Sequence, residues 1–434
     1  MQHEEVLDAG QMLPVPDADG TPETSFPLGF KEFVAMMAAI MAMNALSIDP
    51  MLPSLPDIAK SLKIAAVTDR HWIITLYFVG LGVGSLFYGS LSDRYGRKRV
   101  LSVTMALFLI ATVACALSRS FELMLSGRMA AGFFAGAGRV ISVSIVRDRF
   151  QGDRMARIMS LIFIVFLVVP ILAPGFGQIL AHFFGWRGIF WGLVTISLSV
   201  WIWMLVRLPE TLRPENRVGI NVPDIWAALK IIVTTRRSMG YMMATGVIMA
   251  SMISFITSVQ PILFDVFGAQ AIFPYVFAVI AGSMGVGSFF NSRLVERIGA
   301  RRLSQGALIA FITVAGIHTL VALNGLETLP SFIALQAMTM LCFAFSGSNF
   351  GSISMEPFAR GAGLASSFQA CLTSLVASVL GGFVGSHFDG TTVPLALGFL
   401  TFGSIALLLV AWAERWRLFT RPGLSSLREP QSPR

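Results

Sequence analysis

Long apolar stretches recur along the whole chain, and they constrain the fold more than any other feature of the sequence. Runs of roughly 20 apolar residues match the hydrocarbon thickness of a bilayer when they are helical. Only 13% of the residues are charged and the mean hydropathy is +0.73, whereas soluble domains carry about 25% charged residues. Because the runs are continuous rather than alternating, they favour helices over barrel strands. We therefore expect an all-α membrane protein.

Twelve transmembrane helices are expected between charged or Pro/Gly-rich breaks. Their ranges are 30–49, 71–91, 100–118, 121–146, 157–181, 187–206, 239–262, 272–292, 303–323, 330–350, 362–385 and 393–413. They divide the chain into a disordered acidic cytoplasmic tail (1–28), a six-helix bundle (29–206), a central cytoplasmic loop (207–238), a second six-helix bundle (239–413) and a basic cytoplasmic tail (414–434).

Lys and Arg are unequally distributed between the two sides of this arrangement. With a cytoplasmic N-terminus, 25 of the 32 fall on the cytoplasmic side, 5 on the opposite side and two inside a helix. The positive-inside rule then places both termini in the cytoplasm. The net charge of +8 is explained by this topology, so no nucleic-acid partner is expected. We expect a monomer in the lipid bilayer of a bacterial inner membrane.

Several kinds of chemistry are disfavoured by the sequence. Cys115, Cys342 and Cys371 lie in apolar runs and are interpreted as small buried hydrophobes. The five histidines are scattered, without the spacing of a metal site. No lysine follows a glycine, so the Gly-Lys-Ser/Thr end of a phosphate-binding loop is missing. We therefore expect a protein that is not an enzyme, needs no cofactor and draws its energy from a proton gradient.

Two parts of the chain repeat each other at an offset of 203 residues. Gly82–Ser85 recurs as Gly285–Ser288, and the following loop Asp93–Arg99 corresponds to Glu296–Arg302. The loop retains an acid, an Arg, a Gly and a basic pair in one register. This pattern indicates two pseudo-symmetric halves, an arrangement typical of transporters whose substrate site lies near the membrane midplane.

The loop Gly89-Ser-Leu-Ser-Asp-Arg-Tyr-Gly-Arg-Lys-Arg99 resembles the loop 2–3 signature of the major facilitator superfamily. Other stretches are similar to the Bcr/CflA-type drug:proton antiporters, namely Ser47–Pro56, Arg147–Asp148, Ser354–Pro357, Ala362–Ser367, Phe388–Thr391 and Pro394–Gly398. The resemblance covers residues 30–413. It implies the twelve-helix major facilitator fold and the export of small amphipathic compounds or drugs in exchange for protons.

The resemblance also implies a conformational latch, in which the carboxylate of Asp93 meets the N-terminus of the helix that begins near Gly361–Ala365. By the internal symmetry, Glu296 would face the start of the fifth helix. The latch residues are Gly89, Asp93, Arg94, Gly96, Arg97, Glu296 and Arg297. The alternative is that the basic residues of the loop only fix the topology.

The fifth helix resembles the proline- and glycine-rich antiporter motif of the family. Pro170, Pro174, Gly175 and Gly177 fit this motif, whereas Ala173 and Gln178 depart from it, as does Ala131 from the motif of the fourth helix. Prolines remove backbone hydrogen bonds, so a kink is expected in the fifth helix.

Charged residues inside the apolar runs are the best candidates for proton coupling, because burying a charge in a membrane is expensive. Asp49 ends the first helix and Arg128 lies about two turns into the fourth, so both are expected in the outer third of the membrane. We interpret Asp49 as the protonatable carboxylate and Arg128 as its cation or hydrogen-bonding partner. The alternative is that Asp49, followed by Pro50, only caps the helix.

Arg139 lies on the same face of the fourth helix as Arg128, since eleven residues advance a helix by three turns and about 20°. It either lines a cavity, which would favour anionic or zwitterionic substrates, or extends toward the headgroups. The other cavity candidates are Met41, Asn44, Gln260, Gln336, Phe345 and Asn349. Two further functions stay open: a specific exporter of amino acids, sugars or siderophores, and a transporter-like receptor that moves no substrate.

Overall fold

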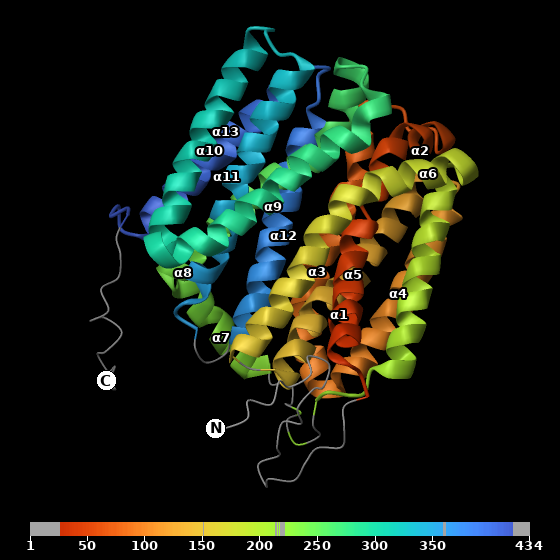
Figure 1. Cartoon of the computed structure of the whole chain (residues 1–434), viewed down its shortest axis with the longest axis vertical. Coiled ribbons are helices and arrows are strands. Elements are labelled where there is room, and N and C mark those ends of the chain that lie inside the picture. The colour runs from red at the N-terminus through yellow and green to blue at the C-terminus, as the bar shows by residue number, and fades with distance from the viewer. Residues whose placement is uncertain are drawn as a thin grey trace, which may run out of the picture. The chain divides into compact units, whose positions relative to one another are not determined.

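The computed structural model describes residues 27–150, 152–212, 215, 217, 222–358 and 362–419, and within these residues it is helical, without strands. Contacts divide the chain into two compact units (Figure 1). The first unit comprises Met1–Ala65 and Leu76–Val222, and the second comprises Ala66–Thr75 and Pro223–Arg434. Most of the predicted tails, 1–28 and 414–434, lie outside the described residues.

The first unit contains the helices of the N-terminal half of the chain. They are α1 (Phe30–Leu46), η1 (Asp49–Ser54), α2 (Leu55–Ser61), most of α3 (Trp72–Tyr95), α4 (Arg97–Ala116), α5 (Phe121–Arg149) and α6 (Gly152–Arg207). Its buried core is formed largely by α1, α5 and α6, including Phe33, Met37, Ile141 and Ile158.

Helix α6 contains both the fifth and the sixth predicted helices. Its 56 residues correspond to roughly 84 Å of helix in total, far more than one bilayer crossing needs. Its only non-helical residue is Gly185, with φ 67° and ψ −178°, a conformation that favours glycine. The two arms on either side of Gly185 are the two predicted spans. The backbone stays helical through Pro170 and Pro174, so these prolines do not interrupt the helix, and the kink expected there stays a prediction.

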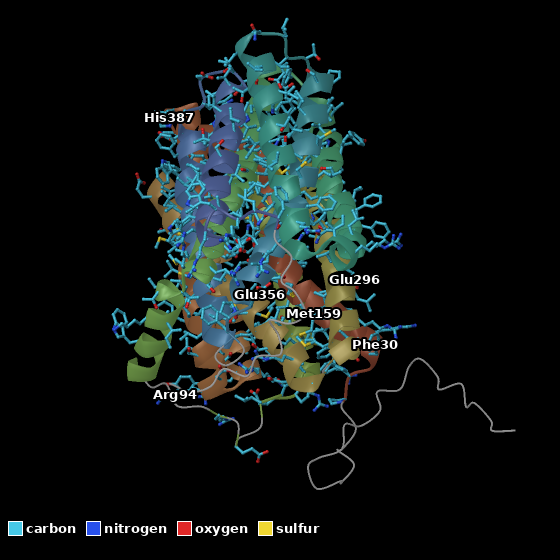
Figure 2. The ribbon with its side chains drawn as sticks, turned by 90° about the vertical axis from the view of Figure 1, so that its left-hand side faces the viewer. Phe30, Arg94, Met159, Glu296, Glu356 and His387 are labelled. Carbon is cyan, nitrogen blue, oxygen red and sulfur yellow. The ribbon has the colours of Figure 1, made fainter. Side chains whose placement is uncertain are left out.

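The second unit contains the helices of the C-terminal half. They are α7 (Val222–Thr234), α8 (Arg236–Pro261), η4 (Ile262–Val266), η5 (Gln270–Ile272), α9 (Phe273–Ile298), α10 (Ala300–Leu323), α11 (Leu329–Met355), α12 (Ala362–Ser386) and α13 (Val393–Ala413), together with η2 (Val67–His71). Figure 2 shows His387 at the opposite end of this unit from Glu296 and Glu356.

The central segment 207–238 is not only a loop, because it contains the helix α7. This helix is anchored by Ile232, which packs with Met242, Phe358 and Ala365. Its Trp226 and Ile231 side chains are exposed. A thirteen-residue helix is too short to cross a bilayer, so the sequence pattern for transmembrane spans did not reveal it.

The described residues contain eleven helical segments that are long and apolar enough to cross a membrane, one of which is the 40-residue segment Val168–Arg207. Division of this segment's helix at Gly185 gives the twelve expected crossings. Many large apolar side chains are exposed along the helices, among them Ile110, Leu172 and Val379. Exposed apolar surface of this extent is stable in lipid and not in water. The all-α membrane fold is thus confirmed.

Candidate functional site

Asp49 lies where α1 changes direction. Helix α1 ends at Leu46 and the 3-10 helix η1 begins at Asp49, with Pro50 in its first turn. The Asp49 side chain is buried, with 5% of its surface exposed. Among the described residues no hydrogen bond or ion pair to its carboxylate is present. A buried carboxylate without a protein partner is rare, because the charged form loses its hydration without compensation.

A polar cluster surrounds the end of α1 next to Asp49. The buried Arg128 guanidinium donates a hydrogen bond from Nη1 to the carbonyl oxygen of Ser47, at 2.9 Å, and lies 4.4 Å from the centroid of the Tyr77 ring. The Tyr77 hydroxyl donates to Oδ1 of Asn44 at 3.1 Å. Three predicted residues, Asn44, Asp49 and Arg128, are therefore brought together at one place in the first unit.

Arg128 was expected as a cation near Asp49 or as its hydrogen-bonding partner, and among the described residues no hydrogen bond joins the two side chains. Within the described part of the first unit, no ion pair joins the two side chains, and Arg128 instead binds the backbone two residues before Asp49. The carbonyl of Ser47 is accessible to Arg128 because the helix ends there and leaves this oxygen without a helical partner. Arg128 thus fixes the end of α1, while Asp49 has no ion-pair partner among the described residues.

Gly177 on α6 positions the backbone beside Asp49. A Cβ atom at Gly177 would lie 1.9 Å from the carbonyl oxygen of Pro50, so only glycine permits this approach of α6 to η1. The predicted antiporter-like motif therefore has a packing role next to the candidate carboxylate. Pro174 is buried, and Pro170 and Gly175 are half-buried.

Substitution of Gly177 by alanine is expected to lower the free energy of unfolding by about 1–3 kcal/mol, because the added methyl group clashes with a backbone atom. Gly306→Ala on α10 is the matched control, since a Cβ atom there meets nothing within 4 Å. The control is expected to be neutral or slightly stabilising, because alanine favours helices. Detergent-based unfolding of both variants measures the difference, and equal stability of the two would contradict the close packing.

Arg139 projects from α5 between the two sides of this helix that pack against α3 and α1. Relative to Arg128, it lies at about 20°, Gly132 at about 40° and Gly138 at about −80° around the helix. A Cβ atom would lie 1.9 Å from Tyr77 O of α3 at Gly132 and 3.2 Å from Ile40 O of α1 at Gly138. The Arg139 side chain is nevertheless exposed. Its direction between α3 and α1 fits the cavity interpretation better than an extension toward headgroups.

Two buried amides of the second unit have no hydrogen-bond partner in the part of the chain that the structure describes. Gln260 on α8 and Gln336 on α11 are fully buried, and neither their Nε2 nor their Oε1 atoms make a hydrogen bond to the described residues. Asn349 is different, because its Nδ2 donates to Asn291 Oδ1 at 2.7 Å and to the carbonyl of Phe345 at 2.8 Å. Gln260 and Gln336 are therefore free to bind a polar group, whereas Asn349 serves the packing of the helix ends.

The remaining cavity candidates are mainly packing residues. Met41 is buried within the core cluster of the first unit, and Phe345 is half-buried on α11. The Phe345 carbonyl accepts the hydrogen bond from Asn349, but among the described residues no polar contact of the Met41 or Phe345 side chain indicates a role in binding.

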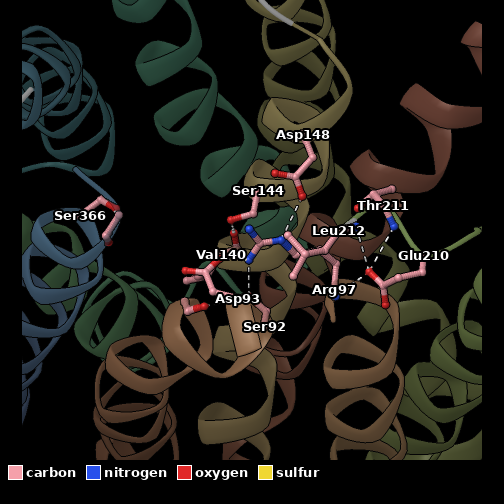
Figure 3. A network of polar contacts seen from close by, with 12 residues as sticks. Ser92, Asp93, Arg97, Val140, Ser144, Asp148, Glu210, Thr211, Leu212 and Ser366 are labelled. Atoms are coloured by element: carbon pink, nitrogen blue, oxygen red, sulfur yellow. Dashed lines mark hydrogen bonds and ion pairs between the residues drawn. The ribbon is translucent and has the colours of Figure 1, made fainter. Parts of the chain in front are cut away.

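Arg97 is the centre of a polar network at the opposite end of the first unit (Figure 3). Its buried guanidinium contacts Asp93 at 2.5 Å, Asp148 at 3.0 Å and the Ser92 hydroxyl at 2.6 Å. The backbone N–H groups of Arg97 and Lys98 donate to Glu210 at 2.8 Å and 3.2 Å. Glu210 thus caps the start of α4, and the network connects the ends of α3, α4, α5 and α6.

A related network connects the corresponding helix ends of the second unit, those of α8, α10, α11 and α13. Arg301 donates from Nε to Glu414 at 3.0 Å and also pairs with Glu356. The Tyr241 hydroxyl donates to Glu414 at 3.1 Å. The loops before these networks have matching backbones: Gly96 has φ 100° and ψ 146°, and Gly299 has φ 92° and ψ 142°. The internal repeat found in the sequence is thus present in the structure.

The sequence interpretation missed several members of these networks. Asp148, Glu210, Arg301 and Glu414 were not proposed as site residues, although three of them are acids that closely follow long apolar spans, which was a usable signal. Gly89 lies half-buried near the network, Arg94 is exposed, and Glu296 and Arg297 are exposed at the end of α9. The latch contacts of Asp93 and Glu296 involve elements of the other unit, and Gly361 lies outside the described residues. The latch stays a prediction.

Comparison with known proteins identifies the family. The family model described as Major Facilitator Superfamily matches residues 34–381. The chain belongs to the major facilitator superfamily. The MFS-type transporter YdgK of Bacillus subtilis is 30% identical over 86% of this chain and 93% of the relative. The multidrug resistance protein MdtL of Escherichia coli is 29% identical over 90% and 96% of the two chains.

Solved structures show the same fold. The structure of a D-xylose–proton symporter covers 88% of this major facilitator chain and 97% of its own, with a TM-score of 0.68 and 14% sequence identity. The chain is therefore a multi-pass membrane transporter and not an enzyme, and the resemblance seen in its loop 2–3 motif is confirmed.

Proposed function

We propose that this major facilitator exports small amphipathic compounds in exchange for protons, with Asp49 as the proton-carrying carboxylate. The observation that carries this proposal is the burial of Asp49 without a hydrogen bond or ion pair among the described residues. An ionised carboxylate in an apolar environment requires a counter-charge. A proton and a cationic substrate can each supply this charge, so the two compete for one site, as antiport requires.

The neighbouring groups support a role in binding rather than in structure alone. Arg128 and Tyr77 fix the end of α1 and thereby the position of Asp49. In the second unit, Gln260 and Gln336 are buried without hydrogen-bond partners among the described residues, and an unsatisfied buried amide costs about 1–3 kcal/mol. Polar groups of a substrate, or water, can relieve this cost. The name of the relative MdtL, a multidrug resistance protein, agrees with export of drugs.

A second candidate is the export of a specific anionic or zwitterionic metabolite, such as an amino acid, a sugar derivative or a siderophore. The exposed Arg139 on the inner side of α5 favours this alternative. A transporter-like receptor is supported by no feature of the described residues. In each case we place the protein in a bacterial inner membrane with both termini cytoplasmic, as a monomer that needs no cofactor beyond the proton gradient.

Proton release from acidified everted membrane vesicles tests the proposal. Addition of a lipophilic cation such as ethidium is expected to collapse part of the proton gradient in vesicles that contain the protein, and not in empty vesicles. A response to amino acids, sugars or siderophores alone would favour the metabolite exporter. Silence to all compounds, with insertion of the protein confirmed, would exclude proton-coupled export of these classes.

A further inference from the structure

Four arginines surround a cleft at the end of the second unit where α8 begins and α13 ends. The cleft has a volume of about 550 Å³ and is lined by Arg236, Arg237, Ala413, Glu414, Arg415 and Arg417. Helices α8 and α13 both belong to apolar spans. The cleft therefore lies at the depth where a bilayer changes from hydrocarbon to headgroups.

The cleft has an excess of positive charge. Its single carboxylate, Glu414, is already bound by the buried Arg301 at 3.0 Å and by the Tyr241 hydroxyl at 3.1 Å, and it lies 3.7 Å from Arg237. Arg415 and Arg417 are exposed, and their side chains form no hydrogen bond or ion pair with the described residues. Two guanidinium groups are thus available for an anion.

The chain after α13 is folded in a way that presents these arginines. Arg415 and Trp416 have φ of 53° and 63°, values that are unfavourable for residues with a side chain. The turn is fixed by hydrogen bonds from Trp416 N to Ala411 O at 2.7 Å and from Phe419 N to Gln305 Oε1 at 2.6 Å. Because these hydrogen bonds hold the backbone in an unfavourable conformation, the fold itself fixes the positions of Arg415 and Arg417.

An exposed apolar stripe leads along α13 to the cleft. Leu397, Ile405, Leu408 and Trp412 are exposed and lie on one face of the helix, since Leu408 follows Leu397 by three turns and about 20°. Arg236 lies over the Trp412 ring, 4.9 Å from its centroid, and donates to the Trp412 carbonyl at 2.8 Å. Tryptophan at the end of an apolar span is typical of the membrane interface.

We propose that this cleft binds the phosphate group of an anionic phospholipid whose acyl chains lie along the exposed stripe of α13. Guanidinium groups bind phosphate through two parallel hydrogen bonds. Basic pockets at helix ends on the cytoplasmic side bind such headgroups, and the positive-inside distribution predicts that side for this cleft. The continuity of the cleft with an apolar stripe favours a lipid over a soluble phosphate. This inference is independent of the transported substrate.

The binding of phosphatidylglycerol to the purified full-length protein, measured by native mass spectrometry, tests the inference. Arg415→Gln with Arg417→Gln is expected to weaken this binding by about 25-fold, at roughly fivefold for each arginine. Arg293→Gln with Arg297→Gln is the matched control, because it removes two exposed charges outside the cleft, near the end of α9. Arg415→Lys with Arg417→Lys keeps the charge and is expected to retain binding within a few fold.

Four results would overturn the inference. The first is unchanged phosphatidylglycerol binding by the double glutamine variant, with folding verified by size-exclusion chromatography. The second is an equal loss in the α9 control, which would indicate diffuse attraction to any basic surface. The third is equally tight binding of phosphatidylcholine, and the fourth is displacement of the lipid by an equal concentration of inorganic phosphate, which would indicate a site for a soluble anion.

Discussion

Asp49→Asn is expected to reduce substrate-evoked proton release in everted vesicles to the level of vesicles without the protein. Asparagine has the size of aspartate but cannot exchange a proton, so the coupling step is lost while the packing around η1 is retained. The free energy of unfolding should be unchanged or slightly raised, because no hydrogen bond or ion pair of the Asp49 carboxylate is lost among the described residues.

Asp57→Asn is the matched control for this experiment. Asp57 is exposed on α2, eight residues beyond Asp49 in the sequence, and its substitution should leave proton release unchanged. Wild-type proton release by Asp49→Asn would show that Asp49 only terminates α1 and that another acid carries the proton.

Arg97→Gln is expected to lower the free energy of unfolding by about 3 kcal/mol, the second-largest effect that we expect. Arg97 is buried and binds two carboxylates, of which Asp148 has only 17% of its side chain exposed. Removal of one partner from a buried ion pair leaves the other charge uncompensated, which costs about 3–5 kcal/mol. Because 42% of the Asp93 side chain is exposed, water can partly hydrate its charge, and we expect a loss at the lower end of this range. Unfolding in mixed detergent micelles measures it.

Arg94→Gln distinguishes this loss from a general effect of the loop charges. Arg94 is exposed, and its guanidinium lies 5.2 Å from the Tyr95 ring centroid. Its substitution should change stability by less than about 0.5 kcal/mol. If both variants were equally stable, the network around Arg97 would have no role in stability.

The sequence predicted the features that depend on local composition. Apolar runs of membrane length gave the twelve crossings, because a helix in lipid must be both long and apolar. The repeat was also visible, since Gly96 and Gly299 occupy positions with positive φ, where a side chain would be strained. Gly177 was noted only as part of the family motif, and its close packing against Pro50 was not foreseen.

Contacts between distant parts of the chain could not be predicted. The partners of Arg97 lie 51 and 113 residues away, at Asp148 and Glu210, and no local pattern specifies them. Arg128 was interpreted as the partner of Asp49 because both were expected in the outer third of the membrane, whereas the structure gives it the carbonyl that the end of α1 leaves free. Helix α7 was missed because it is short and follows a segment rich in charge.

The assignment of Ala66–Thr75 to the second unit has a consequence for biosynthesis. The buried Thr75 and His71 face α12, where a Cβ atom at Gly382 or Gly385 would lie 2.9 Å or 3.2 Å from their side chains. These partners are synthesised more than 300 residues later, so at 5–20 residues per second the wait is roughly 15–60 s. During this time the early segment is in the membrane without its neighbours. A ribosome that stalls before α12 therefore leaves His71 and Thr75 without the helix against which they pack in the finished protein.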